Sequence, residues 1–282
     1  MQKIVFIIGP TATGKTKLGV DLAKKFDGEI ISADSRQVYK YMDIGTGKDL
    51  SEYGEIKVWG LDLVNPDYDF NVSEFRKYAL AAIYDIQKRN KLPVVVGGTG
   101  FYVKAILKPW DTMDIKPDEN LRKKLEGYTV SKLQEELTKA DKNKWEQMNQ
   151  SDRLNPRRLV RAIELAGRMI PKQVQNDIDP LIIGLKASYD LLYERIDRRV
   201  EKRLAQGMAE ELDSLRRFKT RPKTLGYGGE TAREWQFAEH AYARRQMSYF
   251  RNLGLTFQIK WLDINDENLF DKVVEMVEDY LA

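Results

Sequence analysis

Residues 9–16 read GPTATGKT, which matches the phosphate-binding pattern G-x-x-x-x-G-K-[ST] in full. The apolar run from Ile4 to Ile8 precedes this stretch and predicts a buried strand, and Lys17 to Phe26 after it has the pattern of a helix. A strand, a glycine loop and a helix N-terminus bring backbone N–H donors and the positive end of a helix dipole together. The sequence therefore predicts a site for a phosphate chain at the end of the first strand.

Each position of this loop has an expected role. The glycines allow the tight turn, the lysine places a charge on the outer phosphates, and the last hydroxyl is positioned for Mg²⁺. The chain has no cysteine and a single histidine, so a zinc site built from these residues is excluded and Mg²⁺ is the expected metal. A nucleoside triphosphate such as ATP is the usual ligand of such a loop. The predicted phosphate-binding residues are Gly9, Thr11, Ala12, Thr13, Gly14, Lys15 and Thr16, with Thr16 as the metal ligand.

The composition is that of a globular protein with 282 residues, of which 42% are apolar. Such a chain can bury one large core and carry a small insertion. There is no run of about 18 apolar residues and no basic-then-apolar leader, so we expect neither a membrane span nor a secretory signal. The expected location is the cytoplasm.

Short apolar runs alternate with helical patterns over the first hundred residues, which predicts a parallel sheet with helices on both faces. Residues 111–150 are highly charged and helix-forming, which indicates a small helical insertion domain. The expected fold is α/β, a P-loop NTPase-like parallel sheet flanked by helices, with residues 1–110 and 151–282 as its core. The expected strands are Ile4–Ile8, Glu29–Ser32, Ile56–Leu63, Pro93–Val96, Leu181–Ala187 and Gln258–Leu262. The expected helices are Lys17–Phe26, Val72–Lys88, Glu119–Leu125, Ser131–Ala140, Asn155–Leu165, Tyr189–Phe218, Trp235–Phe250 and one at the C-terminus.

Positive charge is unevenly distributed, although the net charge is only +4. Arginines dominate residues 153–168, and arginines with interleaved aromatic residues occupy 242–251; both stretches suggest an anionic partner larger than a metabolite. A third basic stretch, residues 194–203, is balanced by acids and is interpreted as a solvated helix face. The first stretch could equally be an ordinary solvated helix face. Tyr39 and Tyr41 could be either core residues or stacking platforms.

The ends of the other strands narrow the chemistry. In many kinases an apolar strand ends in an aspartate that helps to hold Mg²⁺, but the strand Pro93–Val96 is followed by Gly97 to Gly100. The second strand does end in an acid, Asp34, which should project into the same crevice as the loop, with Thr99 opposite. A carboxylate beside a diphosphate suits transfer of a carbon group to a weak nucleophile whose proton the carboxylate receives. The alternative is that Asp34 is only a turn residue.

Several motifs, in register along residues 3–263, resemble those of the tRNA dimethylallyltransferase family. They are GPTATGKT (9–16), IISADSRQVY (30–39), MDIGT (42–46), VVGGTGFY (95–102), NPRRLVRAIE (155–164), RQ (245–246) and FR (250–251). The resemblance implies that a dimethylallyl group is transferred from dimethylallyl diphosphate to the exocyclic amine of the adenosine 3′ of the tRNA anticodon. It also implies Mg²⁺ as cofactor and the anticodon stem-loop of tRNA as partner. The expected oligomeric state is a monomer, with no membrane partner.

The resemblance also implies roles for single residues. Asp34 would be the general base, the Thr11 hydroxyl would support the transferring oxygen, and Thr99 would contact the flipped adenosine. The implied catalytic residues are therefore Asp34, Thr11 and Thr99. The implied tRNA-binding residues are Asp34, Ser35, Arg36, Gln37, Thr99, Arg122, Arg157, Arg158 and Arg161.

Some positions depart from the family pattern. Gly228 stands where a basic residue is usual, Lys223 where some members have an arginine, and residues 239–241 read EHA in place of the usual Thr-Arg-Gln. Three alternatives remain: an isopentenyltransferase acting on free adenine nucleotides, which would share the core motifs; a small-molecule kinase, which would share the phosphate loop; and, because of the altered turn at Gly228, an inactive RNA-binding relative.

Overall fold

Six parallel strands form one sheet, in the order β3-β2-β4-β1-β5-β6, within the part of the chain that the structure describes. The structure is a computed structural model, and it describes residues 2–168 and 178–282. The strands are β1 (Gln2–Ile8), β2 (Gly28–Ser32), β3 (Val58–Trp59), β4 (Leu92–Gly97), β5 (Ile178–Lys186) and β6 (Lys260–Asp263). The expected parallel sheet is confirmed, but β3 is much shorter than the expected Ile56–Leu63. It ends where Gly60 adopts a φ of +90°, outside the range of a strand.

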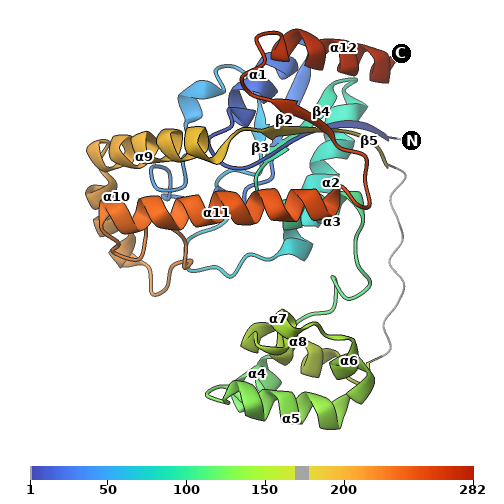
Figure 1. Ribbon diagram of the computed structural model, residues 1–282, viewed down its shortest axis with the longest axis vertical. Helices are drawn as coiled ribbons and strands as arrows, with labels where there is room; N and C mark the ends of the chain where they lie inside the picture. Colours follow the sequence, from blue (N-terminus) through green and yellow to red (C-terminus); the bar gives the residue numbers. More distant parts are fainter. Residues whose placement is uncertain (1, 169–177) are drawn as a thin grey trace. The chain divides into compact units, whose positions relative to one another are not determined.

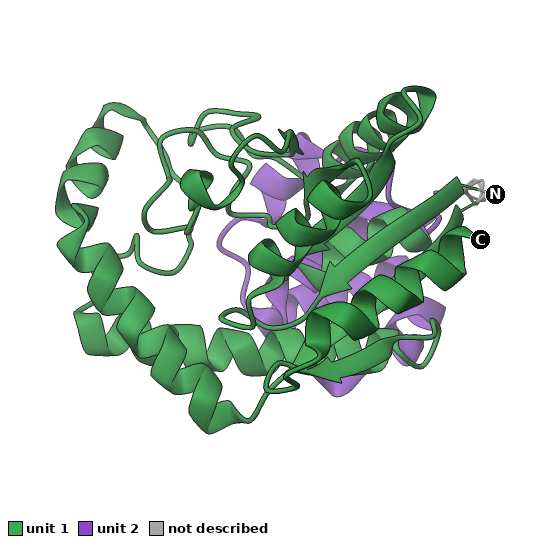
Figure 2. Ribbon diagram, turned by 90° about the horizontal axis from the view of Figure 1, so that it is seen from above, with its two compact units in different colours: residues 1–108, 175–282 green, residues 109–174 purple. Residues whose placement is uncertain are grey.

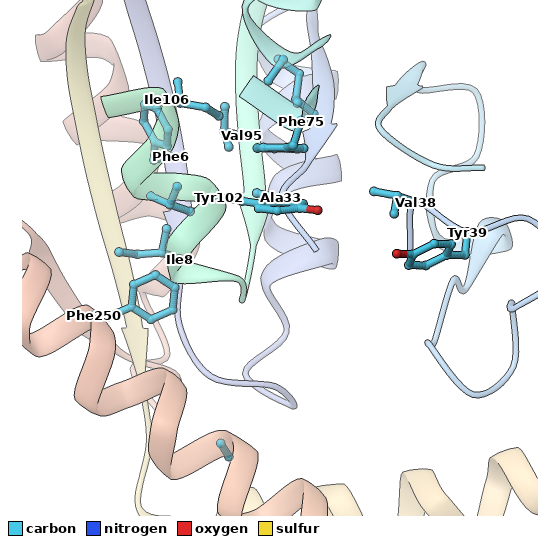
Figure 3. Packing of buried hydrophobic residues seen from close by; sticks show 14 of the residues in the cluster. Phe6, Ile8, Ala33, Val38, Tyr39, Phe75, Val95, Tyr102, Ile106 and Phe250 are labelled. Atoms are coloured by element: carbon cyan, nitrogen blue, oxygen red, sulfur yellow. The ribbon is translucent and has the colours of Figure 1, made fainter. Parts of the chain in front are cut away.

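Apolar side chains on both faces of the central strands create two cores. Along β1, Ile4, Phe6 and Ile8 enter one core, while Val5 and Ile7 enter the other. This division follows from the two-residue repeat of a strand. Figure 3 shows residues of the first core, which α2 (Val72–Lys88), α3 (Gly100–Leu107), α9 (Tyr189–Ala205) and α11 (Ala232–Leu253) cover. The second core lies under α1 (Lys15–Lys25) and α12 (Leu269–Leu281).

The expected helix Tyr189–Phe218 is wrong as a single element. Helix α9 ends at Ala205, and the chain changes direction before α10 (Met208–Ser214). A short 3₁₀ turn, Leu215–Arg217, follows α10. The break lies at Gly207, whose φ of +103° is incompatible with a continuing right-handed helix. Figure 1 shows α11 alongside α9, and residues on both helices belong to the first core.

The second compact unit, residues 109–174, contains only helices among its described residues (Figure 2, purple). These are α4 (Glu119–Leu125), α5 (Val130–Ala140), α6 (Lys142–Gln147), α7 (Gln150–Arg153) and α8 (Pro156–Leu165). Leu159 and Ala162 on α8 share a small core with Leu133 and Leu137 on α5. Helix α8 therefore belongs to this unit, and the boundary differs from the expected one at residue 150. The expected core segment 151–282 also includes residues 169–177, which lie outside the described residues.

The remaining residues, 1–108 and 175–282, form the first unit, which carries the sheet (Figure 2, green). None of the described helices in either unit combines the length and the apolar character that a membrane span requires.

Candidate functional site

The loop of residues 9–16 joins β1 to α1 in a tightly wound conformation. Gly9 has a φ of +149°, and a Cβ there would lie 2.5 Å from the Leu185 carbonyl oxygen, so only glycine fits. Lys15 Nζ donates to the Pro10 carbonyl oxygen (2.7 Å), and Thr13 Oγ1 donates to the same oxygen (2.8 Å). These two bonds hold the loop closed around the lysine.

The ammonium of Lys15 is electrostatically strained in this loop. Burial and the neighbouring guanidinium of Arg199 lower the pKa of Lys15 to about 7, while the carboxylate of Asp34 acts in the opposite direction. An anion placed in the loop would relieve this strain, because it favours the charged lysine.

Helix α9 supplies two arginines to the phosphate loop. Neither was predicted from the sequence as a residue of this site. Arg199 Nη1 donates to Thr11 Oγ1 (3.1 Å), and Arg195 Nη1 donates to the Ala12 carbonyl oxygen (3.3 Å). The interpretation of residues 194–203 as a solvated face is therefore wrong for these two, and also for Arg203, which is buried; Arg198, which pairs with Glu194, does fit it. The spacing of four residues between Arg195 and Arg199 was the available signal, since it places both on one helix face.

Helix α11 locks the loop to the end of β4 through Gln246, another residue not predicted to act here. Gln246 Oε1 accepts from the backbone N–H of Thr11, and its Nε2 donates to the Gly98 carbonyl oxygen, both at 2.9 Å. A Cβ at Gly98 would lie 2.2 Å from Gln246 Nε2. The glycines after β4 thus make room for this amide bridge.

Asp34 lies two residues beyond the end of β2 at Ser32 and is held by Arg36. Asp34 Oδ1 accepts from the backbone N–H of Arg36 (2.9 Å) and lies 3.4 Å from its Nε. Arg36 Nη1 donates to Glu239 on α11 (2.9 Å). Burial acts to lower the pKa of Arg36, but the carboxylates of Asp34 and Glu239 outweigh it and hold that pKa well above its ordinary value. The unusual Glu239 is therefore a buried partner of Arg36.

Thr99, which follows β4, bonds the residue next to Asp34 in the chain. Its Oγ1 accepts from the backbone N–H of Ser35 (3.0 Å). Gln37 donates from Nε2 to the Gly47 carbonyl oxygen (3.1 Å) and accepts from Ser32 through Oε1 (2.8 Å). The residues predicted around Asp34 are thus tied to each other and to neighbouring loops.

Two cavities meet at Arg36. The smaller, about 270 Å³, contains the phosphate loop with Lys15 and Thr16, and Asp34, Arg199 and Gln246 also line it. The larger, about 710 Å³, is lined by Ser35, Arg36, Lys223, Gly228, Tyr242 and Arg245, among others. The first suits a phosphate chain and the second a larger group. Among the described residues, no cluster of three or more histidines or carboxylates could hold a metal ion by itself.

Four of the predicted tRNA-binding arginines lie in the second unit, and their contacts divide them into two pairs. Arg122 Nε and Arg161 Nη1 both bond the buried carboxylate of Glu164, at 2.6 and 3.0 Å. Arg161 also donates to two backbone carbonyls of its own unit. Burial tends to raise the pKa of Glu164, but the bonds from the two arginines lower it overall. Arg157 and Arg158 are exposed, and Arg158 forms an ion pair with Asp152.

The chain is similar to proteins of one family throughout its length. The family model described as IPP transferase matches residues 37–253, and one described as Isopentenyl transferase matches residues 2–57. The tRNA dimethylallyltransferase 1 of Geotalea daltonii is 42% identical over 92% of this chain and 90% of its own. The tRNA dimethylallyltransferase of Caldanaerobacter subterraneus is 35% identical, with 99% of this chain and 98% of its own covered.

Comparison with solved structures points to the same family. A eukaryotic dimethylallyltransferase acting on tRNA matches with a TM-score of 0.86 and 25% identity, over 100% of this chain and 80% of its own. The tRNA isopentenylpyrophosphate transferase of Bacillus halodurans matches with a TM-score of 0.73 and 32% identity, over 100% and 97%. The fold is therefore the P-loop NTPase-like fold of these enzymes. Since both the family model and the relatives span most of its length, this chain belongs to the tRNA dimethylallyltransferase family of prenyltransferases.

Proposed function

We propose that the chain transfers a dimethylallyl group from dimethylallyl diphosphate to the exocyclic amine of the adenosine 3′ of the tRNA anticodon. One observation carries this proposal: Asp34, which follows β2, shares a cavity with a phosphate loop whose cations converge on one small volume. The end of β4, where a kinase would often have an aspartate, consists of glycines that accommodate Gln246. Such a site suits departure of a diphosphate better than transfer of a phosphoryl group.

In the proposed reaction, the bond between the allylic carbon and the diphosphate oxygen breaks as the carbon–nitrogen bond forms. The backbone amides of the loop, Lys15 and Arg199 neutralise the charge that develops on the leaving diphosphate. Thr11, held by Arg199, directs its hydroxyl to the transferring oxygen. The Thr16 hydroxyl and diphosphate oxygens form the kind of ligand set that Mg²⁺ prefers, so a bound Mg²⁺ would add further neutralising charge there.

The alkylated amine must lose a proton, and we assign its acceptance to Asp34. Arg36 holds this carboxylate in place, because the arginine is itself held by Glu239. Thr99, with Ser35 and Gln37, would bind the edge of the adenine. The base has to leave its stack to reach the buried donor, at a cost of a few kcal/mol that phosphate contacts elsewhere must offset.

For those contacts we assign the exposed Arg157 and Arg158 to the backbone of the anticodon stem. Arg122 and Arg161 would contribute mainly by holding the shape of their unit, since both bond Glu164. The proposed setting is the cytoplasm, with the enzyme acting as a monomer.

The test is an incubation of the protein with Mg²⁺, radiolabelled dimethylallyl diphosphate and either unmodified tRNA or free AMP, followed by nucleoside mass analysis. We expect one labelled adenosine per tRNA, next to the anticodon, and no labelled AMP. Label in AMP alone would make the chain an isopentenyltransferase of free nucleotides. Transfer of a γ-phosphate in a parallel incubation with ATP and no RNA would identify a kinase, and tRNA binding without label would identify an inactive relative.

A further inference from the structure

Tyr41 adopts a backbone conformation that favours glycine. Its φ is +63°, in the left-handed region, and 48% of the residue is exposed to solvent. Bulky residues are genuine outliers in this region, and such outliers concentrate at ligand sites. Nothing in the core requires this ring, because nearly half of the residue is accessible. The position would be more easily filled by glycine, so the ring needs a reason of its own.

The ring of Tyr41 is part of a stacked cluster on the surface. It stacks on Phe218, with ring centroids 5.7 Å apart and planes inclined by 29°. The guanidinium carbon of Arg217 lies 4.2 Å from the centroid of Tyr41 and 5.0 Å from that of Phe218. We call these three residues the Tyr41 platform. Flat aromatic rings and guanidinium planes are the surfaces on which unpaired RNA bases stack.

The platform begins a basic segment that leads into the larger cavity. Residues 216–223 contain five cations and no acid: Arg216, Arg217, Lys219, Arg221 and Lys223. Arg221 and Lys223 line the 710 Å³ cavity, together with Ser35 and Arg36 next to Asp34. On the other side, Tyr39, only two residues before Tyr41, lines a small adjoining cavity that also contains Ser35 and Lys223. Both parts of the platform are therefore continuous in the chain with the cavity walls around the proposed adenine site.

We propose that the Tyr41 platform binds an unpaired nucleotide that flanks the modified adenosine in the RNA substrate. Its base stacks on the cluster of Tyr41 and Arg217, and the phosphates on either side contact the cations of residues 216–223. RNA is the occupant that fits, because a partner here must combine planar apolar faces with negative charge. The inference rests on the proposed function, since it takes the RNA to enter through the larger cavity.

The main test is the variant Tyr41→Gly, which removes the ring and also relieves the backbone strain, so the fold is retained. We expect its affinity for an unmodified anticodon stem-loop RNA to fall about tenfold, the order expected for loss of one base–aromatic stack. Its affinity for dimethylallyl diphosphate and its thermal midpoint should not fall. Tyr84→Ala, which removes a tyrosine that is 63% exposed on α2, is the matched control and should bind RNA normally.

Salt dependence separates stacking from charge. Tyr41→Gly should leave the slope of log affinity against log salt concentration unchanged, whereas Arg217→Gln should reduce it by about one unit. A third measurement uses stem-loops with a single abasic position. At one position next to the target adenosine, the wild-type protein should lose about tenfold in affinity while Tyr41→Gly loses nothing further.

Normal RNA affinity in Tyr41→Gly, with or without a lower thermal midpoint, would overturn the proposal and leave the platform as a packing contact. Additive losses at every abasic position would overturn it too. These results differ from failure of the proposed function, in which the wild-type protein itself would not prenylate tRNA.

Discussion

Two helices, α9 in the first unit and α8 in the second, carry arginines that differ in their contacts and exposure. On α9, Arg195 and Arg199 donate to the backbone and a hydroxyl of the phosphate loop, so their charges are held at one small site. On α8, Arg157 and Arg158 stand exposed, and Arg158 also pairs with Asp152 of the same unit. A fixed charge suits a small leaving group with one defined position, whereas exposed and adjustable charges suit the backbone of a nucleic acid.

Each unit also contains a buried glutamate that contacts two arginines. Glu239 lies 2.9 Å from Arg36 and 3.8 Å from Arg203, and Glu164 bonds Arg122 and Arg161. These four arginines stabilise the fold through their contacts with buried carboxylates, whether or not a ligand is bound. A count of basic residues therefore overestimates the charge that is available to a partner.

The largest effect should come from the carboxylate at the centre of the first unit. Asp34→Asn keeps the size of the side chain but cannot accept the proton, so we expect the single-turnover rate to fall by roughly 10²–10⁴. The affinity for dimethylallyl diphosphate should change little. Asp21→Asn on α1 is the control, and a near-normal rate in Asp34→Asn would remove the proposed base.

Neighbouring arginines on α9 allow a direct test of the fixed charges. Arg199→Ala should lower the rate by about 10²-fold, as expected for loss of one preorganised donor to a developing anion, and weaken dimethylallyl diphosphate binding. Arg198→Ala should change both by less than about twofold, because Arg198 forms only an exposed pair with Glu194. Equal effects of the two substitutions, measured by rapid quench, would contradict the distinction between the helix faces.

The exposed charges on α8 should act on RNA alone. In the double variant Arg157→Ala/Arg158→Ala, tRNA affinity at moderate salt should fall about tenfold and the salt slope should decrease by about two units. Binding of dimethylallyl diphosphate should be normal. The control is Lys139→Ala/Lys142→Ala, on other helices of the same unit. An unchanged salt slope would mean that this face of α8 is ordinary surface.

The smallest effect concerns pH and Lys15. Its pKa in the free protein is about 7, and a bound diphosphate raises it because the anion favours the charged lysine. Binding should therefore take up a proton above pH 7, and affinity for dimethylallyl diphosphate should fall about fivefold between pH 7 and 8. Calorimetry in buffers of different ionisation enthalpy measures the proton uptake. Lys17→Met should retain it; the absence of uptake in the wild-type protein would show that Lys15 is charged throughout.

Local signals in the sequence predicted much of the first unit. The phosphate loop is a run of eight consecutive residues whose strand and helix are its direct neighbours, so no distant contact is needed to recognise it. Asp34 and Thr99 could be brought together because the carboxyl ends of parallel strands meet at one edge of a sheet. The alternation of apolar runs and helical patterns was sufficient for the sheet itself.

Long-range packing accounts for what the sequence did not reveal. Arg199 bonds Thr11 across 188 positions of the chain and Gln246 bonds it across 235, and no local pattern encodes such pairs. The same holds for Glu239, which looked like a departure from the family and is a buried partner of Arg36. The residues alone identified a diphosphate loop, a sheet and a carboxylate, because neighbours along the chain define them. The faces that α8 and α9 turn to solvent or to the loop follow from the burial of their apolar sides, which exists only once the distant segments have packed.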